Sequence, residues 1–543
     1  MVEQVKKCSK LQLYVSCRNL TNHLDYGGLD PFVEVYEKVN DENWVKLGTS
    51  EVVQGSLNPV FVTSFSLDYF FEENQMIKFM VYGSEDSENE ATDYNLVGTC
   101  SCPIGQLVGT QGQTLALSII NESKKHSGYL IARIEENSKN NDEIILQFQG
   151  SNIEDVSSFF SPFEPFFYLY RVLPNNEKLR IYMSEYSHGT DPLWKPFTKK
   201  IQDLCHDDFD MKLLLEIYDY KTIGDHEYIG STEFSLQQII ENPKQKFELI
   251  NPRKKTKSKY VNSGFVYIVT CTMKKIPSFF DYIQGGCQIA LEVAIDFTGS
   301  NKHPSSTSSL HYIDPEGIKL NHYQKALQAV SEILLHYDSD KKVPMYGFGG
   351  KVNDVISHCF PLSRDDDNPY AIGVDGIMDV YKRTFEYVGL SGPTLFADLL
   401  KKVILDIERE NVSQNNQQYT ILLILTDGEI HDMDETIKWV VRGSASALSI
   451  VIVGIGNENF TKMTILDADK EPLVDSDGKK MLRDIVQFVP FRDLDNSPYR
   501  LVKEVLDEIP REIVNFFRIK NIVPNPPVQP PQFTFSQDNL FSP

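Results

Sequence analysis

A nearly continuous apolar stretch that ends in an acid and two hydroxyls constrains the fold of this chain more than any other feature. It runs from Gln288 to Asp296, and Glu292 is its only charged residue before the end. A run rich in Ile, Val and Ala is typical of a strand that is buried on both faces of a parallel sheet. Thr298 and Ser300 then follow Asp296 at alternate positions.

The end of this stretch has two interpretations. Carboxylate and hydroxyl oxygens at the carboxyl end of a buried strand suit a small divalent cation, and that edge of a doubly wound sheet is where ligands bind. Asp-x-Thr-x-Ser is also a common turn that caps the helix after it. The stretch alone leaves both interpretations open.

Length, charge and cysteine content narrow the class of protein. A chain of 543 residues is too long for one hydrophobic core, so roughly two to four domains are expected. A net charge of −23 argues against a nucleic-acid binder but permits cation binding. The eight cysteines lack zinc-site spacing and are expected to be free thiols in a reducing compartment. No apolar run approaches the ~20 residues that cross a bilayer, so any membrane contact is expected to be peripheral.

Residues 1 to about 275 consist of short alternating segments separated by turn residues, which predicts β-sandwiches. The region also repeats itself. Asp30-Pro-Phe is echoed by Glu164-Pro-Phe, and Asn95-Leu-Val-Gly by Glu227-Tyr-Ile-Gly. The offset of about 133 residues is a plausible length for a sandwich domain. We therefore predict two similar all-β modules, over residues 1–135 and 136–275.

From about residue 276 the pattern changes to strands that alternate with amphipathic helices. Helical spacing of apolar residues predicts helices over 320–334 and 395–407 and a final helix near 499–517. Buried strands are predicted over 344–349, 420–426 and 448–454. The pattern predicts an α/β doubly wound domain over 276–520, followed by a flexible or polyproline tail over 521–543.

Two further features of this domain bear on the first stretch. The strand over 420–426 also ends in an acid, and a loop before a helix offers a threonine hydroxyl. Both can converge with the first strand end on one ion, through Asp296, Thr298, Ser300, Thr394 and Asp427. The set resembles the metal-ion-dependent adhesion site of von Willebrand factor A domains. Few of these ligands are charged, which suits magnesium or manganese.

The two amino-terminal modules resemble C2 domains, whose loops bind calcium and dock onto phospholipid headgroups. In the first module Asp30 and Glu85 fall on family ligand positions, whereas Asp25, Asp86 and Asp93 are displaced from the pattern. The resemblance implies a degenerate calcium and lipid site formed by Asp25, Asp30, Glu85, Asp86 and Asp93. Calcium tolerates irregular oxygen shells, but a solvated acidic loop is the alternative.

The second module departs further from the calcium pattern. Glu164, Asp219 and Glu227 occupy matching positions, but Lys221 occupies another, and an ammonium repels a cation. We expect no calcium there. A basic run before the module's last strand is a candidate patch for anionic lipid, made of Arg253, Lys254, Lys255, Lys257 and Lys259. A solvated loop is the alternative.

Two C2 domains followed by an A domain is the arrangement of the copine family. Ala294-Ile-Asp-Phe-Thr and Arg483-Asp-Ile-Val-Gln-Phe also resemble that family. The resemblance implies a cytoplasmic protein that associates reversibly with the plasma membrane and with endosomal membranes when calcium rises. Its cofactors would be calcium in the first C2 domain and magnesium or manganese in the A domain. Its partners would be anionic phospholipid membranes and unidentified protein ligands of the A domain, with no nucleic acid.

Catalytic motifs do not appear in the sequence. It has no Gly-x-Ser-x-Gly elbow and no His-Glu-x-x-His zinc helix, so an enzyme is not expected. A metal-dependent hydrolase or phosphotransferase at the membrane is one alternative, because bound divalent ions activate water. A calcium-independent membrane adaptor is another.

Overall fold

The structure is a computed structural model that describes residues 9–21, 29–39, 43–84, 94–136, 142–157, 162–173, 176–205, 208–221, 225–468, 471–494 and 497–533. The chain forms two compact units. One unit joins Met1–Glu136 to Phe279–Pro543, and the other is Asn137–Ser278. Among the described residues, no helix is long and apolar enough to cross a membrane.

The first sandwich has one eight-stranded sheet with the order β3-β2-β5-β6-β7-β8-β1-β4. Its strands are β1 (Ser9–Arg18), β2 (Asp30–Lys38), β3 (Trp44–Thr49), β4 (Phe65–Tyr69), β5 (Met76–Ser84), β6 (Tyr94–Pro103), β7 (Thr114–Ile120) and β8 (His126–Glu136). The helical turns α1 (Ile104–Gly109) and η1 (Gln111–Gln113) follow β6. Alternate residues of β1 are buried, because one face of the strand points into the core.

The second sandwich packs two four-stranded sheets, with the orders β11-β10-β13-β14 and β12-β9-β16-β15. Its elements are β9 (Glu143–Ser151), β10 (Pro165–Val172), β11 (Lys178–Met183), β12 (Phe197–Lys200), α2 (Ile201–Cys205), β13 (Lys212–Asp219), β14 (Glu227–Ser235), α3 (Leu236–Glu241), β15 (Lys246–Glu248) and β16 (Phe265–Lys274). Trp194 fills the centre of the core, where its ring contacts Phe167 edge-on and its Nε1 donates to Pro165 O at 3.1 Å. The all-β prediction is confirmed for both modules.

The carboxyl-terminal domain is built on a sheet of β21-β18-β17-β24-β25-β26 in which β18, β17, β24, β25 and β26 run parallel. The strands are β17 (Gln288–Asp296), β18 (Lys342–Phe348), β21 (Phe360–Pro361), β22 (Tyr370–Ile372), β24 (Gln418–Thr426), β25 (Leu448–Gly454) and β26 (Val486–Pro490). A small separate sheet contains β19 (Gly350–Val352), β20 (Val355–Ser357) and β23 (Val388–Leu390). β17 has the bounds predicted from its apolar run.

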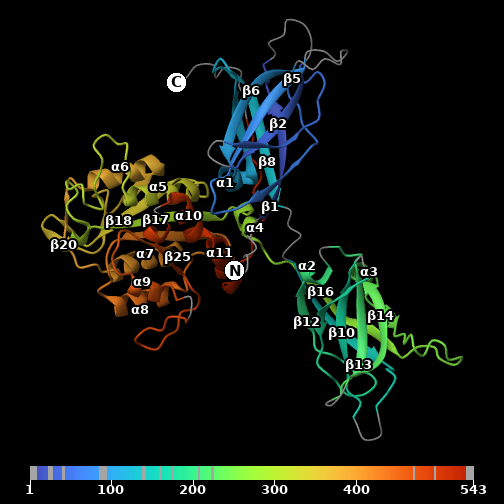
Figure 1. Ribbon diagram of the computed structural model, residues 1–543. Coiled ribbons are helices and arrows are strands. Elements are labelled where there is room, and N and C mark those ends of the chain that lie inside the picture. The colour runs from blue at the N-terminus through green and yellow to red at the C-terminus, as the bar shows by residue number, and fades with distance from the viewer. Residues whose placement is uncertain are drawn as a thin grey trace. The chain divides into compact units, whose positions relative to one another are not determined.

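Helices cover both faces of this sheet (Figure 1). The helices on one face are α4 (Phe279–Gln284), α5 (His322–Leu334), α6 (Gly373–Thr384), α10 (Pro498–Leu506) and α11 (Ile509–Ile519). Those on the other face are α7 (Ala397–Glu410), α8 (Met433–Gly443) and α9 (Thr461–Leu466). The 3-10 turns are η3 (Gly299–Asn301) and η4 (Phe491–Leu494). β17 divides its side chains between the two layers, because Val293 faces one core and Ala294 the other.

Two helix predictions were wrong in detail. The predicted final helix is two helices, α10 and α11, because Pro510 lacks an N–H and its ring cannot lie in a helix interior. The helix predicted from residue 320 begins at His322. Asn321 caps it, since the Asn321 side chain accepts the N–H of Gln324 at 2.9 Å.

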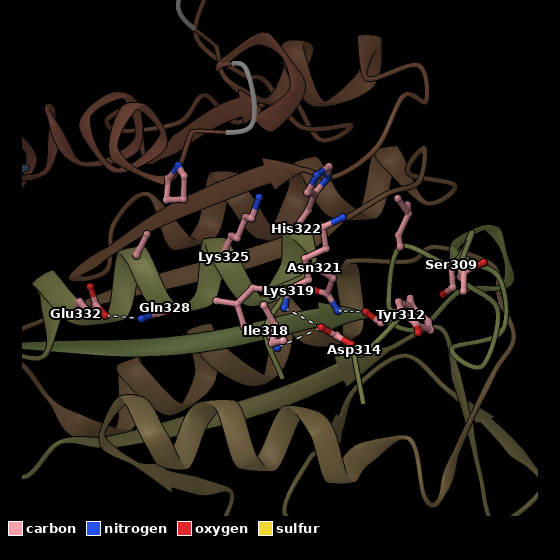
Figure 2. Close-up of a pocket in the computed structure, with 15 residues that line it drawn as sticks. Ser309, Tyr312, Asp314, Ile318, Lys319, Asn321, His322, Lys325, Gln328 and Glu332 are labelled. Carbon is pink, nitrogen blue, oxygen red and sulfur yellow. Dashed lines mark hydrogen bonds between the residues drawn. The ribbon is translucent and has the colours of Figure 1, made fainter. Parts of the chain in front are cut away.

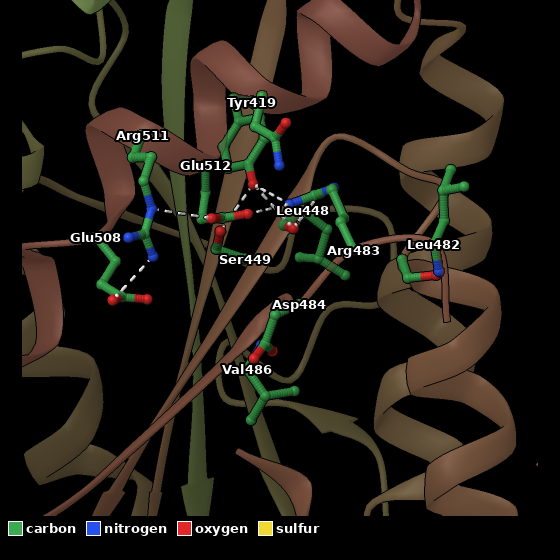
Figure 3. Close-up of polar contacts among 12 residues, drawn as sticks. Tyr419, Leu448, Ser449, Leu482, Arg483, Asp484, Val486, Glu508, Arg511 and Glu512 are labelled. Atoms are coloured by element: carbon green, nitrogen blue, oxygen red, sulfur yellow. Dashed lines mark hydrogen bonds and ion pairs between the residues drawn. The ribbon is translucent and has the colours of Figure 1, made fainter. Parts of the chain in front are cut away.

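A buried arginine fastens α11 to the sheet (Figure 3). Arg483 has only 2% of its side chain exposed, and its Nη1 donates to the Tyr419 hydroxyl at 2.9 Å and pairs with Glu512 at 3.4 Å. Its Nη2 donates to Ser446 O at 2.7 Å. Burial raises the pKa of Glu512 even though Arg483 opposes the shift. The polar groups of this cluster therefore hold one another in place.

Within the first unit, the first sandwich and the α/β domain share a continuous apolar core. The Phe71 ring lies 5.1 Å from Phe279 and 5.0 Å from Tyr337, measured between ring centroids. At Gly109 a Cβ atom would lie 2.0 Å from the carbonyl oxygen of His336, so only glycine allows this approach. Phe71 and α1 both lie at the end of the sandwich opposite Asp30.

The described part of the proline-rich tail contacts the rest of the first unit. The side chains of Gln414 and Gln417 both donate to Val523 O, at 2.8 and 2.7 Å. The N–H of Val528 donates to Gln284 O at 2.9 Å. This proline-rich segment is therefore held by hydrogen bonds at Val523 and Val528.

Candidate functional site

The two acids predicted to end neighbouring strands do lie together. β17 and β24 pair in parallel, so Asp296 and the residue after β24, Asp427, meet at the same edge of the sheet. Both are buried, with 0% and 1% exposed. The Thr426 hydroxyl donates to Asp296 Oδ2 at 2.5 Å, and the Ser300 hydroxyl donates to Asp427 Oδ1 at 2.9 Å. A hydroxyl at or just after the end of each strand thus donates to the acid of the other strand.

The segment after β17 forms both the predicted turn and part of the acid cluster. The N–H of Thr298 donates to Asp296 Oδ1 at 2.8 Å, which is a local turn. The Thr298 and Ser300 hydroxyl oxygens are 2.9 Å apart, and Thr298 Oγ1 also lies 3.4 Å from Asp427 Oδ1. No α-helix follows this turn until His322. The capping interpretation therefore explains only part of the motif.

The fifth predicted residue, Thr394, also lies in this cluster. It is buried in the loop before α7, with 3% exposed. A Cβ atom on Gly428 would lie 2.6 Å from Thr394 Oγ1 and 3.7 Å from Asp296 Oδ2, so both oxygens face the backbone of Gly428. The carboxylate of Asp432 accepts the N–H groups of Phe396 and Ala397 and fixes the loop at the start of α7. All five predicted residues therefore come together.

Residues behind the cluster were not predicted. Asn301 donates from Nδ2 to Asp427 Oδ1 at 2.8 Å, while its Oδ1 accepts the Tyr323 hydroxyl at 2.8 Å. His311 bonds through Nε2 to Asp296 O at 2.8 Å, and burial lowers the His311 pKa to about 3. Asn301 follows the Asp-x-Thr-x-Ser motif directly and could have been suspected. Tyr323 and His311 carry no such signal in the sequence.

The electrostatics of the cluster favour a cation. Burial raises the pKa of Asp296, against the opposing hydrogen bonds from Thr298 and Thr426. Burial and then the charge of Asp296 raise the pKa of Asp427. A divalent ion between the two carboxylates would offset both their desolvation and their repulsion.

The donor set fits magnesium or manganese, which take a few carboxylates together with neutral oxygens and water. Among the described residues, no group of three or more His, Cys, Asp and Glu side chains is placed to hold a metal. An ion at this edge would therefore be held by two carboxylates and by hydroxyl oxygens. Asp296 and Asp427 would supply the charge, and Thr298, Ser300 and Thr394 the neutral ligands.

A groove of about 830 Å³ lies in the same domain, lined by residues of the segment before α5 and of α5 itself (Figure 2). Its floor connects to the cluster, because the Ser309 hydroxyl donates to Asn301 O at 2.9 Å. Apolar and basic side chains line the rest of it, among them Leu310, Ile318, Lys319 and Lys325. Asp314 also lines the groove, and its carboxylate accepts three backbone N–H groups of its own loop.

In the second sandwich the predicted acids are only partly in place for a cation. Asp219 is fully buried at the end of β13, and Lys221 Nζ lies 2.5 Å from its Oδ2. Glu164 contributes its backbone N–H to Asp219 Oδ1 at 2.9 Å, while its carboxylate lies 3.5 Å from His188 Nδ1. Glu227 is opposite Asp219 in the strand register, but it is exposed.

The basic run of the second sandwich lies on the loop before β16, as predicted. Lys254 is engaged, since its Nζ pairs with Glu154 at 2.6 Å. The other members of the run are exposed, namely Arg253, Lys255, Lys257 and Lys259.

In the first sandwich only one of the predicted calcium ligands lies within the described residues. This is Asp30, which is half-buried, and its Oδ1 accepts the N–H of Gly55 at 2.6 Å. The others lie outside the described residues, namely Asp25, Glu85, Asp86 and Asp93.

Comparison with known families assigns both sandwiches. The model of the C2 domain matches residues 10–119 and 146–250, and the model of the copine domain matches residues 309–525. The fold and the site thus define a protein with two C2 domains and a carboxyl-terminal α/β domain. Copine-A of Dictyostelium discoideum is 37% identical over 523 residues, which cover 95% of this chain and 86% of that protein. The chain belongs to the copine family.

Solved structures of C2 domains match parts of this chain. A structure described as BON1-C2B is 18% identical over 25% of this chain and 95% of its own, with a TM-score of 0.21. The calcium-bound pair of C2 domains of Extended-Synaptotagmin 2 is 14% identical over 49% of this chain and 97% of its own, with a TM-score of 0.20. The family assignment and the C2 matches support calcium-dependent phospholipid binding.

Proposed function

We propose that this protein moves to anionic membranes when calcium rises and captures a protein partner there through a metal ion in its carboxyl-terminal domain. The first C2 domain supplies the calcium response in this proposal, and the carboxyl-terminal domain is of the von Willebrand factor A type. The observation that carries the proposal is the convergence of two buried acids and three hydroxyls at one edge of the sheet.

The chemistry of this cluster favours partner capture. Two carboxylates and three hydroxyls are five ligands, so an octahedral ion held by them has one open position, which a carboxylate of a partner can fill. The adjacent groove can hold the chain segment that carries this carboxylate, because apolar Leu310 and Ile318 alternate there with Lys319 and Lys325.

We infer binding at this site, with no turnover. The described groups around it are carboxylates and hydroxyls that already bond to one another. His311, the histidine in contact with Asp296, is buried and neutral and bonds to the main chain, so it does not reach a substrate. General acid–base catalysis by a histidine needs an imidazole that exchanges protons near neutral pH, and a pKa of about 3 excludes His311 from that role.

The metal proposal is tested by titrating the full chain with manganese and comparing it with Asp296→Asn. Asp296→Asn removes one of two charged ligands, so manganese affinity at one site should fall by more than roughly 10–100-fold. That range is the usual loss when only a residue that supports a metal ligand is removed. Asp375→Asn is the matched control, because Asp375 is an exposed acid in the first turn of α6. Equal manganese binding in wild type and Asp296→Asn would refute the site.

The calcium proposal is tested by sedimentation with phosphatidylserine vesicles at increasing calcium. The calcium-dependent increment should vanish in Asp30→Asn and remain in Asp68→Asn. Asp68 is an exposed acid at the opposite end of the same sandwich, near the start of β1. If sedimentation is the same in chelator and in calcium, the calcium-triggered movement is wrong.

A further inference from the structure

We propose that Lys221 is a built-in substitute for calcium in the second C2 domain, and that this end of the domain binds anionic lipid headgroups without calcium. This goes beyond the calcium response of the first C2 domain and does not depend on it.

The carboxylate of Asp219 has both of its oxygens engaged from within the chain. It is fully buried at the end of β13, where an unpaired charge would be costly. Lys221 Nζ lies 2.5 Å from Oδ2, and the N–H of Glu164 donates to Oδ1 at 2.9 Å. Only 20% of the Lys221 side chain is exposed, so the ammonium occupies the space beside the carboxylate where a metal ion would bind.

Hydrogen bonds at this site also join two loops that a bound cation would otherwise hold together. One follows β9 and contains Glu164, and the other follows β13 and contains Tyr220 and Lys221. The N–H of Tyr220 donates to Glu164 O at 3.0 Å, and the N–H of Lys221 donates to His226 Nδ1 at 3.2 Å. The described parts of these loops are therefore held together without a metal.

The basic loop lies at this end of the sandwich. β16 begins at Phe265, which is opposite Ser151, the last residue of β9, so the loop before β16 is adjacent to the loop after β9. Glu154 joins them. Its carboxylate accepts Lys254 Nζ at 2.6 Å and the Ser263 hydroxyl at 2.9 Å. These hydrogen bonds outweigh burial and lower the pKa of Glu154, so the contact is ionic at neutral pH.

The surface formed here has the chemistry of a membrane-contacting face. Four cations of the basic loop are exposed and form no ion pair with described residues, namely Arg253, Lys255, Lys257 and Lys259. Tyr186 is 51% exposed and stacks on Tyr220, with ring centroids 4.7 Å apart. Tyrosine is enriched at membrane interfaces, because its ring is apolar and its hydroxyl can bond to water. Exposed cations beside paired tyrosines fit an anionic bilayer.

The lipid part of the proposal is tested on the full chain in EGTA, with vesicles of phosphatidylcholine alone or with added phosphatidylserine. We expect binding only to the anionic vesicles. Each lysine near such a surface contributes about 1 kcal/mol, or about fivefold, so Lys255→Gln with Lys257→Gln should weaken binding roughly 30-fold. The matched control is Lys200→Gln with Lys244→Gln, two exposed lysines at the opposite end of the same sandwich, which should bind as wild type does.

The substitution of calcium by lysine is tested by calcium titration of the full chain. Lys221→Ala should bind one more calcium ion than wild type, in the 10⁻⁴–10⁻³ M range typical of weak sites, whereas Lys221→Arg should bind no more than wild type. Equal calcium stoichiometry in wild type and Lys221→Ala would overturn the substitution. Absence of binding to anionic vesicles in EGTA, or equal losses in the two double variants, would overturn the lipid site. Neither result bears on the calcium response of the first C2 domain.

Discussion

Replacing Asp427 by asparagine should stabilise the metal-free protein while it removes metal binding. Burial raises the pKa values of Asp296 and Asp427, and the charge of Asp296 raises that of Asp427 further, so the folded state resists carrying both charges. Asparagine has the same shape, and its carbonyl oxygen can still accept from Ser300 and Asn301. The variant therefore loses the repulsion and keeps most of the hydrogen bonds.

The size of the effect follows from the linkage between pKa and stability. Each unit by which folding raises a carboxyl pKa costs about 1.4 kcal/mol at a pH above both values. We expect a net gain of about 1–3 kcal/mol in Asp427→Asn, allowing for imperfect replacement of the hydrogen bonds. The cost is absent below pH ~4, where the group is protonated in both states, and it grows as the pH rises. The gain should therefore be seen at neutral pH and disappear in acid.

Scanning calorimetry of the full chain, in chelator and in manganese, measures this effect. The first unit has roughly 400 residues and an unfolding entropy of about 0.8 kcal/mol/K, so a gain of about 2 kcal/mol raises its Tm by roughly 2 °C. Manganese should raise the Tm of wild type and leave that of Asp427→Asn unchanged, because binding stabilises only the state that binds. A lower Tm for Asp427→Asn in chelator would refute the reasoning, as would an equal response to manganese.

Three further predictions concern the packing and the calcium response. Phe71→Ala should destabilise the first unit by about 3–5 kcal/mol in calorimetry, because it leaves a cavity among buried rings. Val62→Ala should have little effect, because the Val62 side chain is 87% exposed. Arg483→Met should cost about 3–5 kcal/mol in denaturant unfolding, because it removes the buried partner of Glu512 and leaves only the exposed Arg511 beside it; an unchanged midpoint would show that Glu512 is not held by Arg483. Asp219→Asn should leave the calcium dependence of vesicle sedimentation unchanged, and a lost calcium response would contradict the assignment of calcium to the first C2 domain.

The sequence predicted that these side chains lie together, because the motif is local and its convergence follows from topology. Asp296, Thr298 and Ser300 are adjacent in the chain, and Asp427 follows a strand whose apolar run identifies it as buried. Since the carboxyl ends of neighbouring parallel strands meet at one edge, strand type alone brings the acids together. The residues behind them could not be found this way. Tyr323 lies on α5, and only packing brings its hydroxyl to Asn301.

Other features depended on contacts that no sequence pattern records. The predicted final helix is divided near Pro510. The proline is visible in the sequence, yet the continuous apolar stripe predicted one helix. Lys254 was predicted as one of five equal cations, but it is bound to Glu154, about a hundred positions earlier in the chain. The contact of Phe71 with Phe279 and Tyr337 joins two domains that the sequence predicted to be separate cores. Side-chain pairs of this kind are set by tertiary packing.

The chain solves one electrostatic problem in two opposite ways. In the α/β domain Asp296 and Asp427 are buried together, and the described groups that bond to them are hydroxyls, amides and backbone N–H groups, none of which carries a positive charge. In the second C2 domain Asp219 is buried just as deeply, but Lys221 already neutralises it. A site whose charge is unbalanced can respond to an ion, whereas a site with its own ammonium cannot. The position of one lysine therefore separates a domain that we propose to bind a metal ion from one that we expect not to bind calcium.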